Sequence, residues 1–387
     1  MLYLDYAATT PIRSEVKQQM EYYFTEQFGN PHSPHELGTR AMRAIEDARK
    51  RIAIVLGGSP RQIIFTSGGT EANNMAILGG ARARKNKGNH LLTTPIEHKS
   101  ILGPMGALER EGFKVDFLPV DSTGMIDPQQ LENFLLKETV LVSVGHANNE
   151  IGTVQPLEEI APVLRAKGIL LHSDAVQSFG KVPVRIADLG VDLLSISGHK
   201  IYGPKGIGVL YMAPGIRLEP LLYGGDQERG LRPGTLNVPA IMGLAKAVEL
   251  AAEEMDQESS RLKALRDELI TRALLIDGVY LNGHRSERLP NNVNLGVSGI
   301  EGQIIVAELA RRNIAISTGA ACSSGSKDPS HVLTALGQGR EQAYEGFRIT
   351  LGRNTSMQEI LQLVTSLSEV IKDLSDRFKT RIFADSV

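Results

Sequence analysis

The sequence has a single cysteine, Cys322, among its 387 residues, so no disulfide can form within one chain. Packing alone must stabilise the fold, which is typical of proteins in a reducing cytoplasm, where we expect this protein. The N-terminus lacks both the basic start and apolar stretch of a secretory signal and the composition of a transit segment. No apolar run in the sequence approaches the roughly 20 residues that span a bilayer, so we expect no membrane association.

The sequence also has little excess of either charge. It contains 42 Lys and Arg against 44 Asp and Glu, a formal net charge of -2, and it has no long basic run. This balance does not indicate a nucleic-acid partner or an acidic membrane surface. With 42% hydrophobic and 22% charged residues, the composition is typical of a globular protein. The chain is long enough for two domains with a large core.

Short apolar runs alternate with helix-like segments through the first two thirds of the chain. This alternation predicts an α/β fold, in which helices cover both faces of a mostly parallel sheet. Ligands bind such sheets beyond the carboxyl ends of the strands, so polar residues that follow each apolar run are candidates for chemistry. The predicted strands are residues 63–66, 90–93, 115–118, 140–144, 169–172, 193–196 and 208–211.

A long helix is predicted from Ala240 to about Leu275, a stretch rich in Ala, Leu and Glu with no internal proline. We expect it to link a large domain to a smaller α+β domain. The large domain is expected to comprise residues 12–258, and the small domain residues 1–11 and 259–387. Strands are predicted in the small domain at residues 292–295 and 347–351. Between them, Ser317 to Pro329 is rich in Ser, Gly and Ala and predicts a mobile loop around Cys322.

The segment Ser67-Gly68-Gly69-Thr70-Glu71 follows the first predicted strand and opens a helix-like run that extends to Arg84. Glycines let the backbone approach an anion closely, and a helix N-terminus offers unpaired N–H groups and the positive end of a dipole. Thr70 adds a hydroxyl. Taken alone, the segment fits a plain capped turn equally well. It is not a P-loop, because no Gly-Lys-Ser/Thr follows.

Two further strand ends carry polar groups. Asp174 ends one apolar run, and Gln177 lies three residues later. The carboxylate can pair with a protonated heterocyclic nitrogen, although a helix N-cap is the better interpretation of Asp174 alone. Lys200 ends Ser197-Gly198-His199-Lys200 after another apolar run. Most lysines are solvated surface residues, but partial burial in a cleft favours an uncharged amine that can form a Schiff base with an aldehyde cofactor.

Together with further motifs along the chain, these segments make the sequence resemble the cysteine desulfurases of the NifS/IscS type, which belong to the class V aminotransferase group of pyridoxal-phosphate enzymes. The resemblance extends over nearly the whole chain. Each motif is weak alone, but the ordered set is specific. In the family's order, the motifs are Asp5 to Pro11, Gly29-Asn30-Pro31, Ser67 to Ala72, Glu97-His98, Asn148 to Gly152, Asp174 to Gln177, Gly198-His199-Lys200, Arg232 to Thr235 and Gly319 to Cys322.

The resemblance implies pyridoxal-phosphate fold type I, with pyridoxal 5'-phosphate as the cofactor. The implied reaction converts L-cysteine to L-alanine and leaves the sulfur as a persulfide on Cys322, for iron–sulfur cluster assembly or thiolation. It also implies a homodimer, a sulfur-acceptor protein such as an iron–sulfur scaffold, and no metal. The alternative is a selenocysteine lyase or another class V enzyme, which would keep Lys200 and Asp174 but would not need Cys322.

The resemblance also implies a role for individual residues. Lys200, Cys322 and His98 form the catalytic set, with Lys200 as the base for the substrate α-proton and His98 moving thiol protons. Arg348 binds the substrate carboxylate with help from Asn30. The residues implied to hold the cofactor are Lys200 at the aldehyde, Asp174 at the ring nitrogen, Gln177 at the phenolic oxygen, His98 on the ring face, Asn149 at the ring edge, and Gly69, Thr70, Ser197 and His199 at the phosphate.

Thr235 is implied to reach the phosphate of the cofactor in the neighbouring subunit. Asp226 and Pro233 depart from the family's commonest pattern close to this expected dimer contact. We therefore expect the departures to affect the geometry between subunits rather than the reaction.

Overall fold

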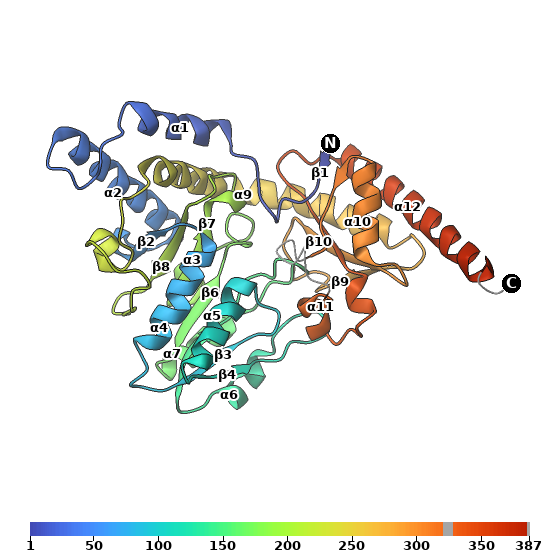
Figure 1. The fold of residues 1–387 in the computed structure, drawn as a ribbon, viewed down its shortest axis with the longest axis horizontal. Coiled ribbons are helices and arrows are strands. Elements are labelled where there is room, and N and C mark those ends of the chain that lie inside the picture. Colours follow the sequence, from blue (N-terminus) through green and yellow to red (C-terminus); the bar gives the residue numbers. More distant parts are fainter. Residues whose placement is uncertain (320–327, 385–387) are drawn as a thin grey trace.

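The computed structural model describes residues 1–319 and 328–384, with side chains described as far as residue 376. Its largest sheet has seven strands in the order β2-β8-β7-β6-β5-β3-β4 (Figure 1). All pairings are parallel except those of β8, which runs antiparallel to both β7 and β2. The strands are β2 (Ile63–Thr66), β3 (His90–Thr93), β4 (Lys114–Phe117), β5 (Thr139–Ser143), β6 (Leu170–Asp174), β7 (Leu193–Ser197) and β8 (Gly208–Met212). The predicted α/β fold and all seven of these strands are confirmed.

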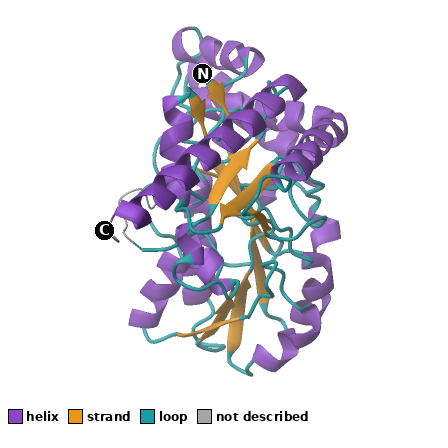
Figure 2. Ribbon diagram, turned by 90° about the vertical axis from the view of Figure 1, so that its right-hand side faces the viewer, coloured by secondary structure: helices purple, strands orange, loops and turns teal. Residues whose placement is uncertain are grey.

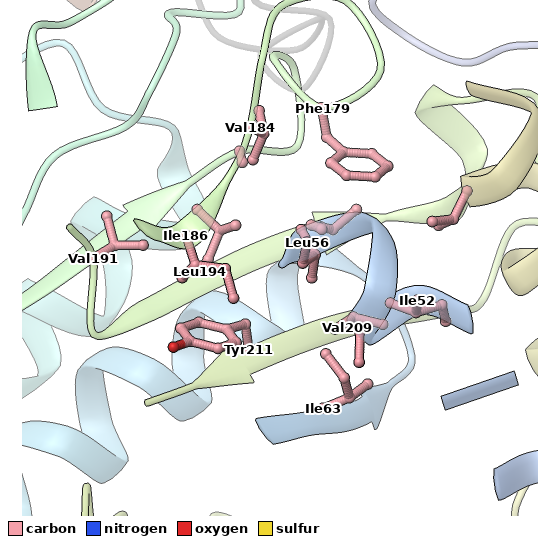
Figure 3. Packing of buried hydrophobic residues seen from close by; sticks show 14 of the residues in the cluster. Ile52, Leu56, Ile63, Phe179, Val184, Ile186, Val191, Leu194, Val209 and Tyr211 are labelled. Atoms are coloured by element: carbon pink, nitrogen blue, oxygen red, sulfur yellow. The ribbon is translucent and has the colours of Figure 1, made fainter. Parts of the chain in front are cut away.

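Both faces of this sheet are buried, which is why its strands are continuous apolar runs rather than alternating ones. In β2, Ile63 and Phe65 pack into one core while Ile64 packs into the other. On the first face, Ile52 and Leu56 pack near Ile63, Val209 and Leu194 of the sheet (Figure 3). The helices on this face include α2 (Glu36–Leu56), α7 (Leu157–Ala166) and α8 (Ile186–Leu189).

The opposite face is covered by the chain that follows β2 and by the helix after β3. The predicted helix after β2 is confirmed as α3 (Gly69–Asn74), a π-helical stretch (Met75–Gly79) and α4 (Gly80–Arg82). The other helices of this part of the chain are α1 (Ser14–Thr25), α5 (Lys99–Arg110) and α6 (Leu131–Phe134). Helices on both faces leave the carboxyl-end edge of the sheet as the open place for a ligand.

A separate core lies around two smaller sheets, on the right-hand side of Figure 1 and facing the viewer in Figure 2. One has the antiparallel order β12-β10-β9, and the other pairs β1 with β11 in parallel. The elements are β1 (Leu2–Tyr3), β9 (Val279–Asn282), β10 (Asn292–Val297), β11 (Ile314–Ala315), β12 (Phe347–Thr350), α10 (Gly302–Arg311), α11 (His331–Ala335) and α12 (Met357–Ala384). The smaller α+β unit and its two predicted strands, β10 and β12, are confirmed.

The predicted long helix is α9 (Val238–Ala273). It contributes to one core of the large sheet and to the core around the small sheets. Its first half, Val238 to Leu250, packs with the large sheet, and its second half, Leu262 to Ala273, packs with the small sheets. The exact division of the domains, at residues 12 and 258, stays a prediction. No helix among the described residues is both long and apolar enough to cross a membrane.

Candidate active site

A cavity of about 330 Å³ lies beyond the carboxyl ends of β6 and β7, with Arg348 of the small domain on its wall. Its lining comes from segments that are far apart in the sequence. Ten of the predicted site residues line this cavity: Gly69, Thr70, His98, Asn149, Asp174, Gln177, Ser197, His199, Lys200 and Arg348. The fold therefore gathers most of the predicted site in one place.

Three predicted residues are not among those lining the cavity. Asn30 and Thr235 are exposed in the single chain, and the Asn30 side chain accepts a hydrogen bond from the backbone N–H of His32. Cys322 lies outside the described residues, as does most of the loop predicted around it. The roles implied for these three residues stay predictions.

Lys200 ends a short 3₁₀ turn (Gly198–Lys200) directly after β7. Its Nζ donates hydrogen bonds to the backbone oxygens of Ala7 and Ala8, at 2.5 and 2.7 Å. Gln177 donates to the same oxygen of Ala7 through Nε2, at 3.0 Å. The N-terminal segment thus forms part of the cavity wall and holds the lysine amine in place.

Asp174 is the last residue of β6, and its carboxylate is held at both oxygens. Oδ2 accepts a hydrogen bond from Asn73 Nδ2 at 2.7 Å, and Oδ1 accepts from the backbone N–H of Val176 at 2.8 Å. No regular helix begins here, so Asp174 is not a helix N-cap. The carboxylate is instead fixed in a turn that faces the cavity.

His98 is the N-cap of α5, and its Nδ1 accepts a hydrogen bond from the backbone N–H of Ser100 at 3.1 Å. Burial lowers the pKa of His98, and the nearby Asp174 carboxylate only partly opposes that effect. The lowered pKa favours the neutral imidazole. Because Nδ1 accepts a hydrogen bond, the hydrogen of this neutral ring lies on Nε2.

The start of α3 requires glycine. Gly68 has φ 150°, and a Cβ on Gly69 would lie 2.6 Å from Val176 Cγ2. A Cβ on Gly208, in the neighbouring strand, would lie 2.7 Å from the backbone of Gly68. Side chains are therefore excluded, and the first N–H groups of α3 lie beside the cavity that Gly69 and Thr70 line.

Arg348 comes from the opposite side, in β12, and only 2% of it is exposed. Its Nη1 donates to the backbone oxygens of Asn149 and Gly319, at 2.8 and 2.9 Å. Its Nη2 donates to Asp5 Oδ1 at 2.9 Å. Among the described residues, its buried Nε has no hydrogen-bond partner.

Two buried carboxyl groups in the cavity wall were not predicted to be functional. Burial raises the pKa of Glu97 to about 7, although Thr94 and the N–H of Gly145 donate hydrogen bonds to it. Burial also raises the pKa of Glu150. Both residues lie in quoted family motifs, but nothing in the sequence shows that their side chains are buried. No metal-binding group of three or more His, Cys, Asp or Glu side chains occurs among the described residues.

Comparisons with known proteins agree with this geometry. The aminotransferase class-V family matches residues 2–363. The chain is 48% identical over 374 residues to cysteine desulfurase IscS of Dictyoglomus turgidum, covering 96% of this chain and 95% of that protein. A solved NifS-like protein superposes with a TM-score of 0.90 at 37% identity, covering 96% of this chain and 99% of the other. SspA in complex with cysteine superposes with a TM-score of 0.81 at 39% identity, covering 91% and 99% of the two chains. The chain therefore belongs to the class-V aminotransferase family, within its cysteine desulfurases of the NifS/IscS type.

Proposed function

We propose that this protein is a pyridoxal-phosphate-dependent cysteine desulfurase that converts L-cysteine to L-alanine and carries the sulfur as a persulfide on Cys322. The observation that carries the proposal is the convergence of the Lys200 amine, the Asp174 carboxylate and the Arg348 guanidinium on one cavity. The first two groups suit a cofactor with an aldehyde and a ring nitrogen. The third suits the carboxylate of an amino acid.

The residues around the cavity fit pyridoxal phosphate. Its volume of about 330 Å³ lies within the ordinary range for small-molecule sites. Lys200 would hold the aldehyde, Asp174 the ring nitrogen and Gln177 the phenolic oxygen, with His98 over the ring and Asn149 at its edge. Gly69, Thr70, Ser197 and His199 would hold the phosphate. When bound, this cofactor supplies an electron sink for negative charge at the substrate Cα.

Lys200 is the residue that takes the substrate α-proton. As an ammonium group, its Nζ is stabilised by the oxygens of Ala7 and Ala8, which accept hydrogen bonds from it. The same two oxygens keep the amine in the cavity after it has taken the proton. The lysine thus stays in position to return that proton.

His98 is suited to move a proton through Nε2, because Ser100 donates to its Nδ1. In the neutral form the ring can donate the Nε2 hydrogen into the cavity. Asp174, held by Asn73 and Val176, would keep its negative charge aimed at a protonated ring nitrogen. His98 therefore exchanges a proton, whereas Asp174 provides a fixed negative charge.

Cys322 follows three residues after Gly319, which lines the cavity. Three residues of extended chain span at most about 10 Å. This length suits a thiol that must meet the substrate sulfur in the cavity. The thiolate is the reactive form of cysteine. Its attack on the substrate sulfur would form a sulfur–sulfur bond as the carbon–sulfur bond breaks, and the electron pair of the broken bond would stay on the carbon fragment, which takes up a proton to become alanine.

The proposal includes a homodimer in the cytoplasm and transfer of sulfur to an acceptor such as an iron–sulfur scaffold. In the dimer, Thr235 would reach the phosphate of the partner subunit's cofactor. The exposed side chains of Leu222 and Tyr223, 52% and 86% accessible, precede Thr235 in the chain. Apolar groups exposed in this way are typical of a surface that a second subunit covers.

The test compares the wild type with Cys322→Ser. The wild type should absorb visible light as a Schiff-base cofactor, form alanine, and gain the mass of one sulfur atom at Cys322 after brief exposure to cysteine. The variant should keep the absorbance and lose at least about 100-fold in sulfide release, because a hydroxyl is a poor nucleophile toward sulfur. Full-rate sulfide release by the variant would contradict the proposal and favour a selenocysteine lyase-like reaction.

A further inference from the structure

The guanidinium of Arg348 has five N–H donors, and contacts within the described part of the chain use three of them. Both hydrogens of Nη1 are taken by the backbone oxygens of Asn149 and Gly319, and one hydrogen of Nη2 by Asp5. The remaining donors are Nε and the second hydrogen of Nη2. A buried donor without an acceptor is unfavourable. A ligand oxygen that accepts a hydrogen bond from Nε would remove this cost.

A carboxylate suits these two remaining donors. Its two oxygens can accept one hydrogen bond each from Nε and Nη2 in the side-on, bidentate arrangement that Arg commonly makes. Since Nη1 is fully used by backbone oxygens, the opposite edge of the guanidinium cannot serve. The contacts within the protein therefore select the edge that receives the ligand.

Asp5 is the only side chain among these three contacts, and the N-terminal segment fixes its position. The Tyr3 hydroxyl donates to the backbone oxygen of Asp5 at 2.9 Å, and Asp5 forms a parallel β-bridge with Thr350. Two and three residues farther along, the backbone oxygens of Ala7 and Ala8 hold Lys200. In Figure 1 this segment runs from β1, in the small domain, toward α1 in the large domain.

We propose that Asp5 is the positioning residue of a carboxylate receptor formed by Arg348, and that it makes the site selective for amines that carry a free α-carboxylate. The inference rests on the proposed function only for the class of ligand, an α-amino acid. Asp5 does not touch the ligand. It acts by holding Nη2, which leaves Nε and the second Nη2 hydrogen for the two oxygens of a carboxylate.

The test measures binding rather than turnover. L-Alanine and ethylamine differ by the carboxylate alone, so the ratio of their dissociation constants reports the receptor. Both are titrated into the holoenzyme and followed by the change in cofactor absorbance. In Asp5→Ala, the dissociation constant for L-alanine should rise about tenfold, as expected for the loss of one charge-assisted hydrogen bond, and that for ethylamine should change less than about twofold. Asp5→Asn, whose amide oxygen can still accept from Nη2, should return L-alanine to within about threefold of the wild type.

The matched control is Asp373→Asn, which breaks an exposed Arg–Asp contact, with Arg312 at 3.2 Å, away from the cavity. It should change neither dissociation constant, and melting temperatures of all variants check that they fold. The inference is overturned if Asp5→Ala binds L-alanine as tightly as the wild type or more tightly. It is also overturned if both ligands weaken equally, or if Asp5→Asn restores nothing. Absence of desulfurase activity with normal discrimination between the two ligands would instead count against the proposed function alone.

Discussion

The two sides of the cavity are built in different ways. On the large-domain side, Asp174 and Ser197 end neighbouring parallel strands, and Lys200 follows three residues after Ser197. On the small-domain side, Arg348 is oriented by three separate segments, at Asp5, Asn149 and Gly319. On the first side one sheet positions the backbone, and the N-terminal segment only holds the Lys200 amine. The second side depends throughout on how the two domains and the N-terminal segment meet.

This difference predicts how substitutions on each side of the cavity affect the protein. Adjacent parallel strands bring their carboxyl ends together independently of the conformation of the loops, because backbone hydrogen bonds set the spacing of the strands. The Arg348 side has no such register to rely on, and backbone oxygens supply two of its three contacts. We therefore expect substitutions on the sheet side to abolish the chemistry, and those on the Arg348 side mainly to weaken substrate binding.

The largest expected effect comes from the sheet side. Lys200→Ala should lower alanine formation from L-cysteine by at least about 1000-fold, because it removes both the nucleophilic amine and the base. Lys205→Ala, an exposed lysine nearby, is the control and should keep its rate. If Lys200→Ala retained more than a few per cent of the wild-type rate, the sheet side would not hold the chemistry.

A smaller effect is expected on the other side. Arg348→Lys should lower kcat/KM for L-cysteine by about 100-fold, mostly through KM, because an ammonium group cannot replace a bidentate guanidinium. Steady-state kinetics measure the two parameters separately, with Arg353→Lys as the control at a more exposed arginine. A fall in kcat with an unchanged KM would remove the distinction drawn between the two sides.

The smallest effect concerns stability and tests the burial of the sheet side. The unfolded chain releases the Glu97 proton near pH 4.5, but burial raises the pKa in the folded protein to about 7. The folded state therefore gains stability that is fully present below about pH 4.5 and is lost as the pH rises through about 7. Glu97→Gln lacks this loss, because its side chain does not titrate.

Relative to the wild type, Glu97→Gln should gain on the order of 2 kcal/mol in the free energy of unfolding between pH 5 and pH 8. Urea unfolding at the two pH values measures this difference, and Glu109→Gln, at an exposed carboxyl, should show none. An equal difference between Glu97→Gln and the wild type at both pH values would show that Glu97 is not buried in the working protein.

Much of the sheet side was predictable from the sequence. The apolar runs locate all seven strands from β2 to β8 within one or two residues, and polar residues that follow several of them line the cavity as expected. The short strands β1 and β11 were not predicted, because two residues each carry no periodic pattern. β9 was also missed, because its apolar run, Val279 to Leu281, is only three residues long.

By itself, the sequence determined the class of fold, the family and the chemical groups of the site, because each apolar run and each motif is a short stretch of neighbouring residues and their order can be followed along the chain. Only the tertiary structure decided which donors of Arg348 remain for a ligand, that Asp5 holds this arginine, and that Glu97 is buried. Hydrogen-bond partners and desolvation depend on segments that are hundreds of residues apart, such as Asp5 and Arg348, and no local pattern records their meeting.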